Sequence, residues 1–486
     1  MSTTSSRPPN PGDLRTPSKG PGTDNRRGGR PALLLVALLG TQFMALLDTF
    51  IVSTALPTMR ADLDASGAGL QLVAAGYTIA YAVFLVTGAR LGALIGHRRV
   101  WIGGLALFTA ASLACGLAAD TGQLIGFRLV QGAGAALLIP QVLSLIQRNF
   151  TGEARARVLG AYSAVLALGA VSGLVVGGVL VGADLFGLAW RPAFLVNVPI
   201  GAVLLLLGLR VLPHDRGDRS ARGLDLPGLV LLGAAVCLLT VPLVLGHETG
   251  WPTWTWVGLT ASAVVFGAFL AYESRLARRG GAPLVSPRVL RIPGMGRAAF
   301  GIAVAMAVNA GFVFAAALHV QDGLGYGALH AGLLFAPTAL AFGLAGLTWQ
   351  RWPARLQAVL VPAGFALAGL STAVCGLLWR EGGDGGLLLL PALVCLGAGL
   401  SCAFSPVLAG ALATVRLEDA PDASGLLVTV TQLGQVLGVS AFGTLFLSQR
   451  TTTGAAGSAD GWWWCSLALA FVSLLGAAAH LVRARR

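Results

Sequence analysis

Two side chains of opposite charge interrupt the long apolar runs of this sequence, and both could take part in proton chemistry. Asp48 lies in a run that starts at Pro31 and stays apolar for about 25 residues, enough to cross a bilayer. An Asp at the centre of a membrane helix costs roughly 2.5 to 3.5 kcal/mol, so such a residue usually faces a bundle interior or a wet cavity. Arg128 lies in another apolar run, between Leu124 and Gly134.

The two residues lie at matched depths. With a helical rise of about 1.5 Å per residue, Asp48 is roughly 13 Å and Arg128 roughly 10 Å from the same side of the membrane. Burial disfavours a charged carboxylate, whereas a neighbouring guanidinium favours it. We therefore predict that Asp48 exchanges a proton, with Arg128 as its partner, and that its occupancy depends on the side to which a cavity opens. The alternative is a permanent structural ion pair without a role in transport.

Neutral polar residues recur at membrane depth and predict the wall of a cavity. An interhelical hydrogen bond explains any one of them, but as a set, together with Trp and Phe residues, they suit a roomy amphipathic pocket. The predicted cavity residues are Gln42, Gln131 and Gln141 in the first half and Asn309, Gln321, Gln432 and Gln435 in the second. No acidic residue lies mid-span in the second half, which favours neutral, zwitterionic or anionic lipophilic substrates over dications.

The elements that would position these residues are membrane helices. Of the 486 residues, 55% are hydrophobic and only 11% are charged, whereas soluble domains carry about 25% charged residues. We predict an all-α membrane protein with fourteen transmembrane helices. Their expected spans are 32–57, 69–94, 100–118, 122–147, 157–182, 193–212, 226–246, 254–273, 297–319, 329–349, 357–379, 386–413, 424–448 and 462–482.

The connections between the predicted spans divide the chain. Residues 1–30 are rich in Ser, Pro, Gly and Arg and are expected to form a disordered cytoplasmic tail. The longest cytoplasmic connections flank the seventh and eighth spans. We therefore predict a six-helix bundle over 31–212, a linker with two extra transmembrane helices over 213–295, and a second six-helix bundle over 296–486. Two such halves suit a transporter that rocks around a midplane site.

The distribution of positive charge predicts the orientation. With the N-terminus inside, all of the 33 Lys and Arg residues fall on the cytoplasmic side except Arg60, Arg128, Arg191, Arg380 and Arg450. We expect a multi-pass protein of the cytoplasmic membrane with both termini in the cytoplasm. The net charge of +13 reflects this topology and does not indicate a nucleic-acid partner. The expected partners are a small lipophilic substrate, protons and the lipid bilayer, and we expect a monomer.

The sequence lacks the usual signatures of an enzyme. It contains no phosphate-binding Gly-Lys-Ser/Thr loop, no pair of histidines at metal-ligand spacing and no nucleophile elbow. The six cysteines show no spacing typical of a zinc site. We therefore predict that the chain is not an enzyme, holds no metal and uses no cofactor, its source of energy being a proton gradient.

Several motifs resemble the major facilitator superfamily, and specifically its fourteen-helix drug:proton antiporter branch. Leu47 to Pro57 resembles the first-helix signature of that branch, Arg128 to Ala135 its fourth-helix motif, and Gly169 to Gly178 its fifth-helix antiporter motif. Phe194 to Gly201 and Asp419 to Gly434 are similar to its helices 6 and 13. The resemblance implies multidrug efflux by proton antiport, with the arginine of the fourth-helix motif involved in proton transfer.

The resemblance also implies gating and packing residues. In the family, an aspartate in the loop between helices 2 and 3 is thought to hold the two halves together on the inner side, and Ala93 stands at its place here. Glycines of the fifth helix are expected to form the surface along which the halves slide. The predicted residues are Arg90, Gly92, Gly96 and Arg98 in the loop, and Gly169, Gly173, Gly177 and Gly178 in the fifth helix.

The sequence thus predicts a proton-driven exporter of small lipophilic compounds, such as drugs, antibiotics or secondary metabolites, that works by alternating access. Two alternatives stay open. One is an exporter of lipids or metabolites with the same fold. The other is a binding or sensor protein on a transporter scaffold that no longer cycles, which Ala93 suggests.

Overall fold

The computed structural model describes residues 29–184, 187–215, 225–281, 283–380, 382–415, 420–450 and 454–481. All elements in these ranges are helical. The first seven are α1 (Gly29–Leu63), α2 (Gly67–Ile95), α3 (His97–Gly116), α4 (Thr121–Asn149), α5 (Gly152–Gly182), α6 (Pro192–Leu195) and α7 (Asn197–Val211). The expected disordered tail lies outside the described residues, apart from its last two, which begin α1.

The second part of the chain continues the helical pattern. A pair, α8 (Leu226–Glu248) and α9 (Thr253–Arg278), is followed by the short α10 (Pro287–Leu290). The remaining elements are α11 (Met295–Leu318), the π-helical η2 (His319–Gly323), α12 (Ala328–Thr348), η3 (Trp349–Arg351), α13 (Ala354–Leu378), η4 (Gly386–Leu388), α14 (Leu389–Ala413), α15 (Ala420–Ser448) and α16 (Ala455–Leu481).

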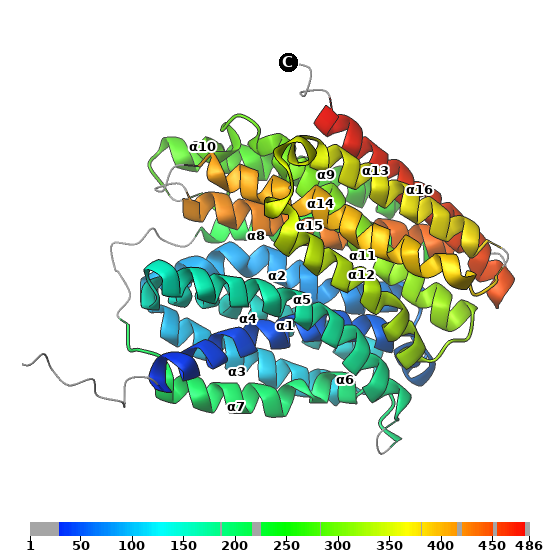
Figure 1. Cartoon of the computed structure of the whole chain (residues 1–486), viewed down its shortest axis with the longest axis horizontal. Helices are drawn as coiled ribbons and strands as arrows, with labels where there is room; N and C mark the ends of the chain where they lie inside the picture. Colours follow the sequence, from blue (N-terminus) through cyan, green and yellow to red (C-terminus); the bar gives the residue numbers. More distant parts are fainter. Residues whose placement is uncertain are drawn as a thin grey trace, which may run out of the picture.

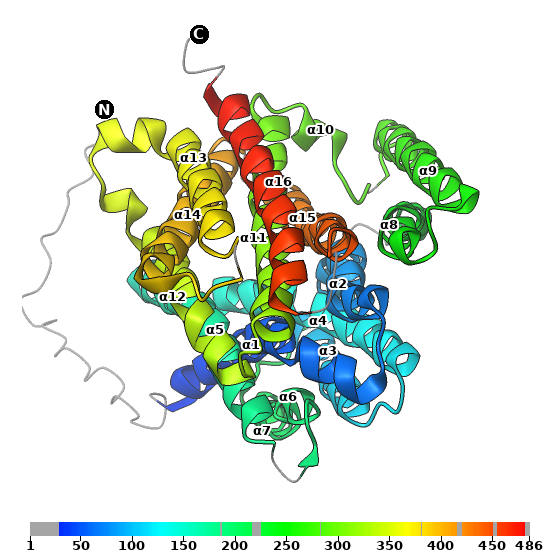
Figure 2. The same cartoon turned by 90° about the vertical axis from the view of Figure 1, so that its right-hand side faces the viewer.

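The helices form two groups that lie side by side. Helices α1 to α7 occupy the lower part of Figure 1 and α11 to α16 the upper part. The groups meet where α5 packs on α12, α2 on α15, and α1 on α11 and α12. The pair α8 and α9 lies at the edge of this interface, as Figure 2 shows, and α8 contacts both α2 and α15.

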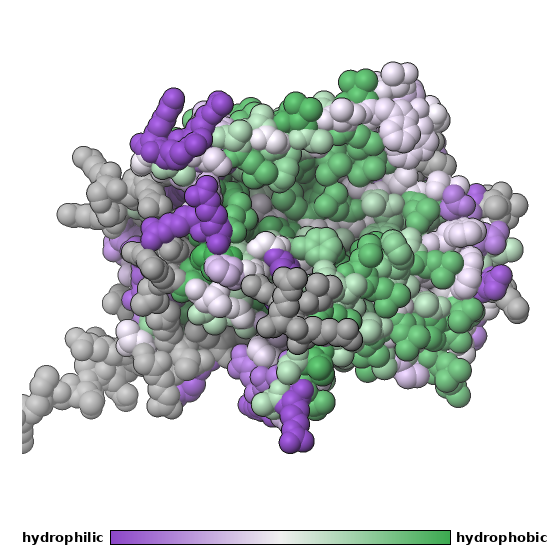
Figure 3. All heavy atoms as spheres, turned by 90° about the horizontal axis from the view of Figure 1, so that it is seen from above, coloured by the Kyte–Doolittle hydropathy of each residue, from purple (hydrophilic) through white to green (hydrophobic). Residues whose placement is uncertain are grey.

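The outer surface of the helices suits a bilayer. Thirteen helical stretches of the described residues are long and apolar enough to cross a membrane, with α6 and α7 counted as one stretch. In α5 the described apolar stretch is the shorter Ser172–Gly182. Figure 3 shows apolar side chains over the middle of one face, with hydrophilic side chains gathered mainly at the left-hand end and the right edge. A multi-pass membrane protein follows from these features.

Local sequence explains where the helices that carry the site begin. The Asp120 carboxylate accepts a hydrogen bond from Gln123 N at 2.8 Å and caps α4, which places Arg128 two turns into that helix. The break between α6 and α7 also follows from the sequence. Pro199 has no N–H to donate to the carbonyl of Leu195, so the helix stops there and restarts at Asn197.

Candidate transport site

The carboxylate of Asp48 is held entirely by donors from other helices. Its Oδ2 accepts a hydrogen bond from Arg128 Nη1 at 2.8 Å, and its Oδ1 accepts one from Gln131 Nε2 at 2.8 Å and one from Asn197 Nδ2 at 2.7 Å. Asp48 is 0% exposed and Arg128 is 1% exposed. The three donors, one of them the guanidinium of Arg128, give both carboxylate oxygens a hydrogen-bond partner. The predicted pairing of Asp48 with Arg128 is therefore present.

Arg128 is fixed by contacts on every side. Its Nη1 also donates to Gln131 Oε1 at 2.7 Å, and its Nε donates to the carbonyl of Val73 at 3.3 Å. The guanidinium lies over the ring of Tyr77, 4.5 Å from the centroid, and 5.7 Å from that of Phe194. Cation–π contacts of this kind are stronger in dry surroundings. Helices α2, α4 and α6 thus share the positioning of one charge.

Asn197 is a site residue that the predictions from the sequence did not include. Its Nδ2 bonds Ser112 Oγ at 3.1 Å as well as Asp48, and Ser112 Oγ donates to the carbonyl of Phe194 at 2.9 Å. The break between α6 and α7 turns this amide toward the acid. The sequence feature that could have indicated this role is a carboxamide two residues before a proline in an otherwise apolar run.

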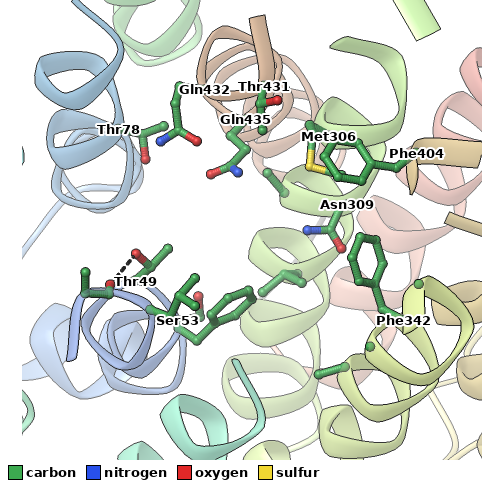
Figure 4. A pocket seen from close by; sticks show the side chains of 18 of the residues that line it. Thr49, Ser53, Thr78, Met306, Asn309, Phe342, Phe404, Thr431, Gln432 and Gln435 are labelled. Atoms are coloured by element: carbon green, nitrogen blue, oxygen red, sulfur yellow. Dashed lines mark hydrogen bonds between the residues drawn. The ribbon is translucent and has the colours of Figure 1, made fainter. Parts of the chain in front are cut away.

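A central cavity of about 650 Å³ lies between the two groups of helices. Figure 4 shows amides of α11 and α15 directed into it, opposite Thr49 and Ser53 of α1. Its polar lining includes Gln42, Thr49, Ser53, Thr78, Asn309, Thr431, Gln432 and Gln435. Its aromatic lining includes Tyr77, Tyr81, Phe50, Phe312, Phe314, Phe335, Phe342 and Phe404. Arg128 reaches the cavity wall, whereas Asp48 is not among the lining residues and lies behind it.

Four of the seven residues predicted to line a cavity lie in the wall of the central cavity, and three do not. Gln42, Asn309, Gln432 and Gln435 line the cavity, and Gln131, Gln141 and Gln321 do not. Gln131 bonds Asp48 and Arg128 instead. Gln141 bonds His97 Nδ1 at 2.7 Å and the carbonyl of Gly88 at 2.9 Å, inside the first bundle. Gln321 belongs to η2, near the end of the bundle opposite the cavity mouth. Gln131 and Gln141 thus lie on faces of α4 that turn away from the cavity, whereas Gln321 lies beyond the end of α11.

The cavity extends toward one end of the bundle only. Its lining reaches Trp349 and Gln350 after α12 and Leu412 near the end of α14. This is the end of the bundle where α1 begins and where Arg351 and Arg355 lie, and we call it the Arg-rich end. At the far end, Asp322 Oδ2 bonds Arg60 Nη1 at 3.1 Å and lies 3.9 Å from Arg450 Nη1. These contacts join α1, η2 and the segment after α15 and close the far end.

Comparisons with known proteins agree with this architecture. The sequence matches the family model of the Major Facilitator Superfamily over residues 38–439. The chain belongs to the Major Facilitator Superfamily. It is therefore a membrane transporter and not an enzyme.

Two relatives of this transporter have names that describe transport or export. The probable actinorhodin transporter of Streptomyces coelicolor is 36% identical over 457 residues, covering 92% of this chain and 78% of that protein. The cephamycin export protein CmcT of Amycolatopsis lactamdurans is 39% identical over 430 residues, covering 87% and 86%. The fold resembles that of a bacterial homolog of the human lysosomal transporter Spinster, crystallised inward-facing and unoccupied, with a TM-score of 0.66 at 18% identity, covering 94% of this chain and 98% of that one.

The predicted loop between the second and third helices is a single residue, Gly96, so Arg90 and Gly92 lie in α2 and Arg98 lies in α3. The two arginines anchor this junction to neighbouring segments. Arg90 Nη2 donates to the carbonyl of Pro283, and Arg98 Nη2 donates to the carbonyl of Leu209 at 2.8 Å. Gly96 has a φ of 104°, a conformation that favours glycine. A Cβ at Gly92 would collide with the amide of Gln141. The two predicted arginines therefore bond neighbouring segments, and the two predicted glycines occupy positions that disfavour a larger side chain.

A carboxylate does reach this loop, but from another part of the chain than the family pattern predicts. Ala93 leaves the usual position without an acid. Asp215, which follows α7, accepts hydrogen bonds from His97 N at 2.6 Å and Arg98 N at 3.1 Å. It caps the first turn of α3, where a negative charge is favourable. The prediction from Ala93 alone overlooked this second source of negative charge.

Three of the four α5 glycines that were predicted to lie between the halves face α1 of the first half instead. A Cβ at Gly169 or Gly173 would meet α1, at 2.9 Å from Leu46 Cβ and 2.7 Å from Phe50 Cβ, and one at Gly177 would collide with Thr54. These contacts lie within the first bundle. Only Gly178 faces the second bundle, where a Cβ would lie 2.6 Å from Leu329 Cα of α12. One further residue turns the helix by about 100°, which separates Gly178 from Gly177.

Proposed function

We propose that this transporter exports small lipophilic compounds in exchange for protons, by alternating access. The observation that carries the proposal is the position of Arg128, which lines the cavity and at the same time binds the buried carboxylate of Asp48. A substrate in the cavity and a proton on Asp48 would both act on this one guanidinium. Transport of this kind needs no cofactor.

The proposed cycle starts from the conformation described here. In this state the cavity would face the Arg-rich end and Asp48 would carry no proton, so substrate would enter while no proton is bound. When the cavity opens to the far end, Asp48 takes up a proton. Protonation removes the charge that holds Arg128 and replaces one accepting oxygen with a donor, so Arg128 turns toward the cavity and substrate leaves. Return to the first conformation releases the proton at the Arg-rich end.

The lining favours a class of substrate. Aromatic rings offer stacking surfaces and the amides of Asn309, Gln432 and Gln435 offer donors and acceptors, while Arg128 supplies positive charge. Neutral, zwitterionic or anionic lipophilic molecules with aromatic or carbonyl groups suit this wall. The names of the relatives, an actinorhodin transporter and a cephamycin exporter, agree with this class.

The proposed topology follows the expectation from the sequence. We count α5 as a further membrane span, which brings the total to fourteen, because it packs between α1 and α12 over 31 residues. The two six-helix halves would be 31–212 and 296–486, with 213–295 as the linker that carries α8 and α9. The Arg-rich end would face the cytoplasm, with both termini there, in the cytoplasmic membrane. We expect a monomer to be sufficient.

The test is efflux from proteoliposomes with an imposed pH gradient, using a fluorescent aromatic substrate. Asp48→Asn should lower gradient-driven efflux at least about tenfold, which corresponds to about 1.4 kcal/mol, while substrate exchange without a gradient persists. Asp120→Asn is the matched control, because Asn caps a helix as well as Asp does. Full gradient-driven efflux in Asp48→Asn would refute proton coupling at this residue.

A further inference from the structure

A pair of buried acids lies in the linker, away from the cavity. Asp225 precedes the first turn of α8 and is 5% exposed, and Glu273 lies near the end of α9 and is 1% exposed. Each carboxyl group has one oxygen with partners. Asp225 Oδ1 accepts from Gly228 N at 2.9 Å and from Tyr272 Oη at 3.0 Å, and Glu273 Oε2 accepts from Val285 N at 2.8 Å.

The other oxygen of each carboxyl group is buried without a hydrogen-bond partner. These atoms are Asp225 Oδ2 and Glu273 Oε1. They are directed to the same place, because a Cβ at Gly228 would collide with Asp225 Oδ2 and would lie 2.5 Å from Glu273 Oε1. Two bare carboxylates in this arrangement would repel each other and would each lack a donor. A single proton between them supplies the missing partner to both oxygens at once.

We propose that Asp225 and Glu273 form a second proton-binding site, which holds one proton and ties α8 to α9 at the Arg-rich end. The charged or titratable groups of the described residues that act on the pair are Arg90 of α2 and Tyr272 of α9. The positive charge of Arg90 favours a net negative charge on the pair, and hence one proton rather than two. The site is distinct from Asp48 and does not depend on the function proposed for that residue.

The pair is connected to the first bundle through one short segment. Val285 N donates to Glu273, and the carbonyl of Pro283, two residues earlier, accepts from Arg90 at the end of α2. Leu284 and Val285 are buried in the same apolar cluster as Leu229 and Phe269 of the linker helices. Loss of the shared proton would place two like charges in contact at this junction. The linker would then loosen from α2 as pH rises at the Arg-rich end.

Infrared spectroscopy of the purified protein tests the proton directly. Wild type should show the signal of about one protonated carboxyl per molecule at neutral pH. The signal should be absent in Glu273→Gln, whose amide can donate to Asp225 Oδ2 and still accept from Val285 N. It should persist in Glu248→Gln, a matched control in which an exposed carboxylate at the other end of α8 is removed. Persistence of the signal in Glu273→Gln, or its absence from wild type, would overturn the proposal.

Two further variants keep the outcome interpretable. Asp225→Asn places the amide on the other partner and should remove the same signal, so it replaces Glu273→Gln if that variant does not fold. Asp48→Asn should leave the signal intact, which separates this site from the proposed coupling site. The Tm of wild type should fall more steeply with rising pH than that of Glu273→Gln. A Tm that responds to the concentration of sodium or potassium and not to pH would indicate a bound cation and refute a shared proton.

Discussion

The two halves of the transporter use their buried centres differently. In the first half, three helices, α1, α4 and α7, direct Asp48, Arg128, Gln131 and Asn197 at one another, and the centre is charged. In the second half, a buried cluster of large side chains consists of aromatic rings. His319 lies 5.2 Å from Trp379 and stacks on Trp462 at 5.7 Å, and its Nδ1 bonds Ser458 Oγ at 2.8 Å.

The difference separates two tasks. A charged centre changes its hydrogen bonds when a proton arrives, whereas an aromatic centre keeps its shape because its contacts do not depend on charge. Both halves contribute to the cavity wall, but only the first contributes a charged side chain to the described lining. Under the mechanism proposed above, the first half would bind the proton, and the second half would provide a rigid surface for the substrate and for the movement of the first half.

The largest expected effect is the loss of Arg128. Arg128→Met leaves the buried carboxylate of Asp48 without its countercharge, which should cost about 3–5 kcal/mol of stability. The double variant Asp48→Asn with Arg128→Met should recover much of this loss, because no buried charge remains. Thermal unfolding in detergent of both single variants and the double variant measures the coupling. An additive double variant would mean that the two residues do not act as a pair.

Removal of a large ring from the second half should give a stability loss of similar size without a change in proton response. Trp462 is fully buried and its Nε1 donates to the carbonyl of Cys375 at 3.2 Å. Trp462→Ala should therefore cost about 3–5 kcal/mol. The pH at half-maximal efflux should equal that of wild type in reconstituted protein that remains folded. A shifted pH midpoint would show that the second half also affects the response to protons, which would contradict the division of tasks between the halves.

Asn197→Ala, unlike Trp462→Ala, should change the pH at half-maximal efflux. The change removes one of three donors to Asp48, and the loss of a buried hydrogen bond costs about 1–3 kcal/mol. With one donor fewer, the carboxylate is easier to protonate, so the pH at half-maximal efflux should move upward. Ser112→Ala is the control, because Ser112 contacts Asn197 and does not bond Asp48. An unchanged pH midpoint in Asn197→Ala would show that the amide only packs.

The smallest expected effect lies at the junction between the halves. In Gly178→Ala the new Cβ would lie 2.6 Å from Leu329 Cα, and overpacking of this kind costs about 1–3 kcal/mol, but only while α5 and α12 are in contact. The variant should therefore favour separation of the far ends of these helices, measured as a longer distance between spin labels placed there. Gly182→Ala, one turn away, would place its Cβ 3.7 Å from Leu329 and should leave the distance distribution unchanged.

The sequence predicted the parts of this molecule that depend on composition along the chain. Helix spans follow from apolar runs, and the pairing of Asp48 with Arg128 follows from two charges at equal depth. The direction in which a side chain points around its helix was harder to predict, because membrane helices are apolar on most sides. For that reason Gln131, Gln141 and Gln321 were assigned to the cavity, and Gly177 and Gly178 to one surface.

Contacts between distant segments were the other source of error. Nothing near Ala93 indicates that Asp215 would cap α3, since 118 residues separate Asp215 from His97. The pairing of Asp225 with Glu273 likewise depends on how α8 and α9 pack. Asn197 could have been suspected, because a carboxamide within an apolar run needs a partner, but the identity of that partner required the fold.

The cluster at the far end also determines how the surroundings act on the transporter. One carboxylate, Asp322, is shared by Arg60 and Arg450, and the side chain of Arg60 is 38% exposed. Pairs of this kind contribute only about 0–1 kcal/mol and weaken as ions screen them. In the proposed orientation, higher salt outside the cell would weaken these ion pairs and so ease opening to the outside. Ions in the cytoplasm would not affect them. The bias between the two conformations would then vary with the habitat of the cell.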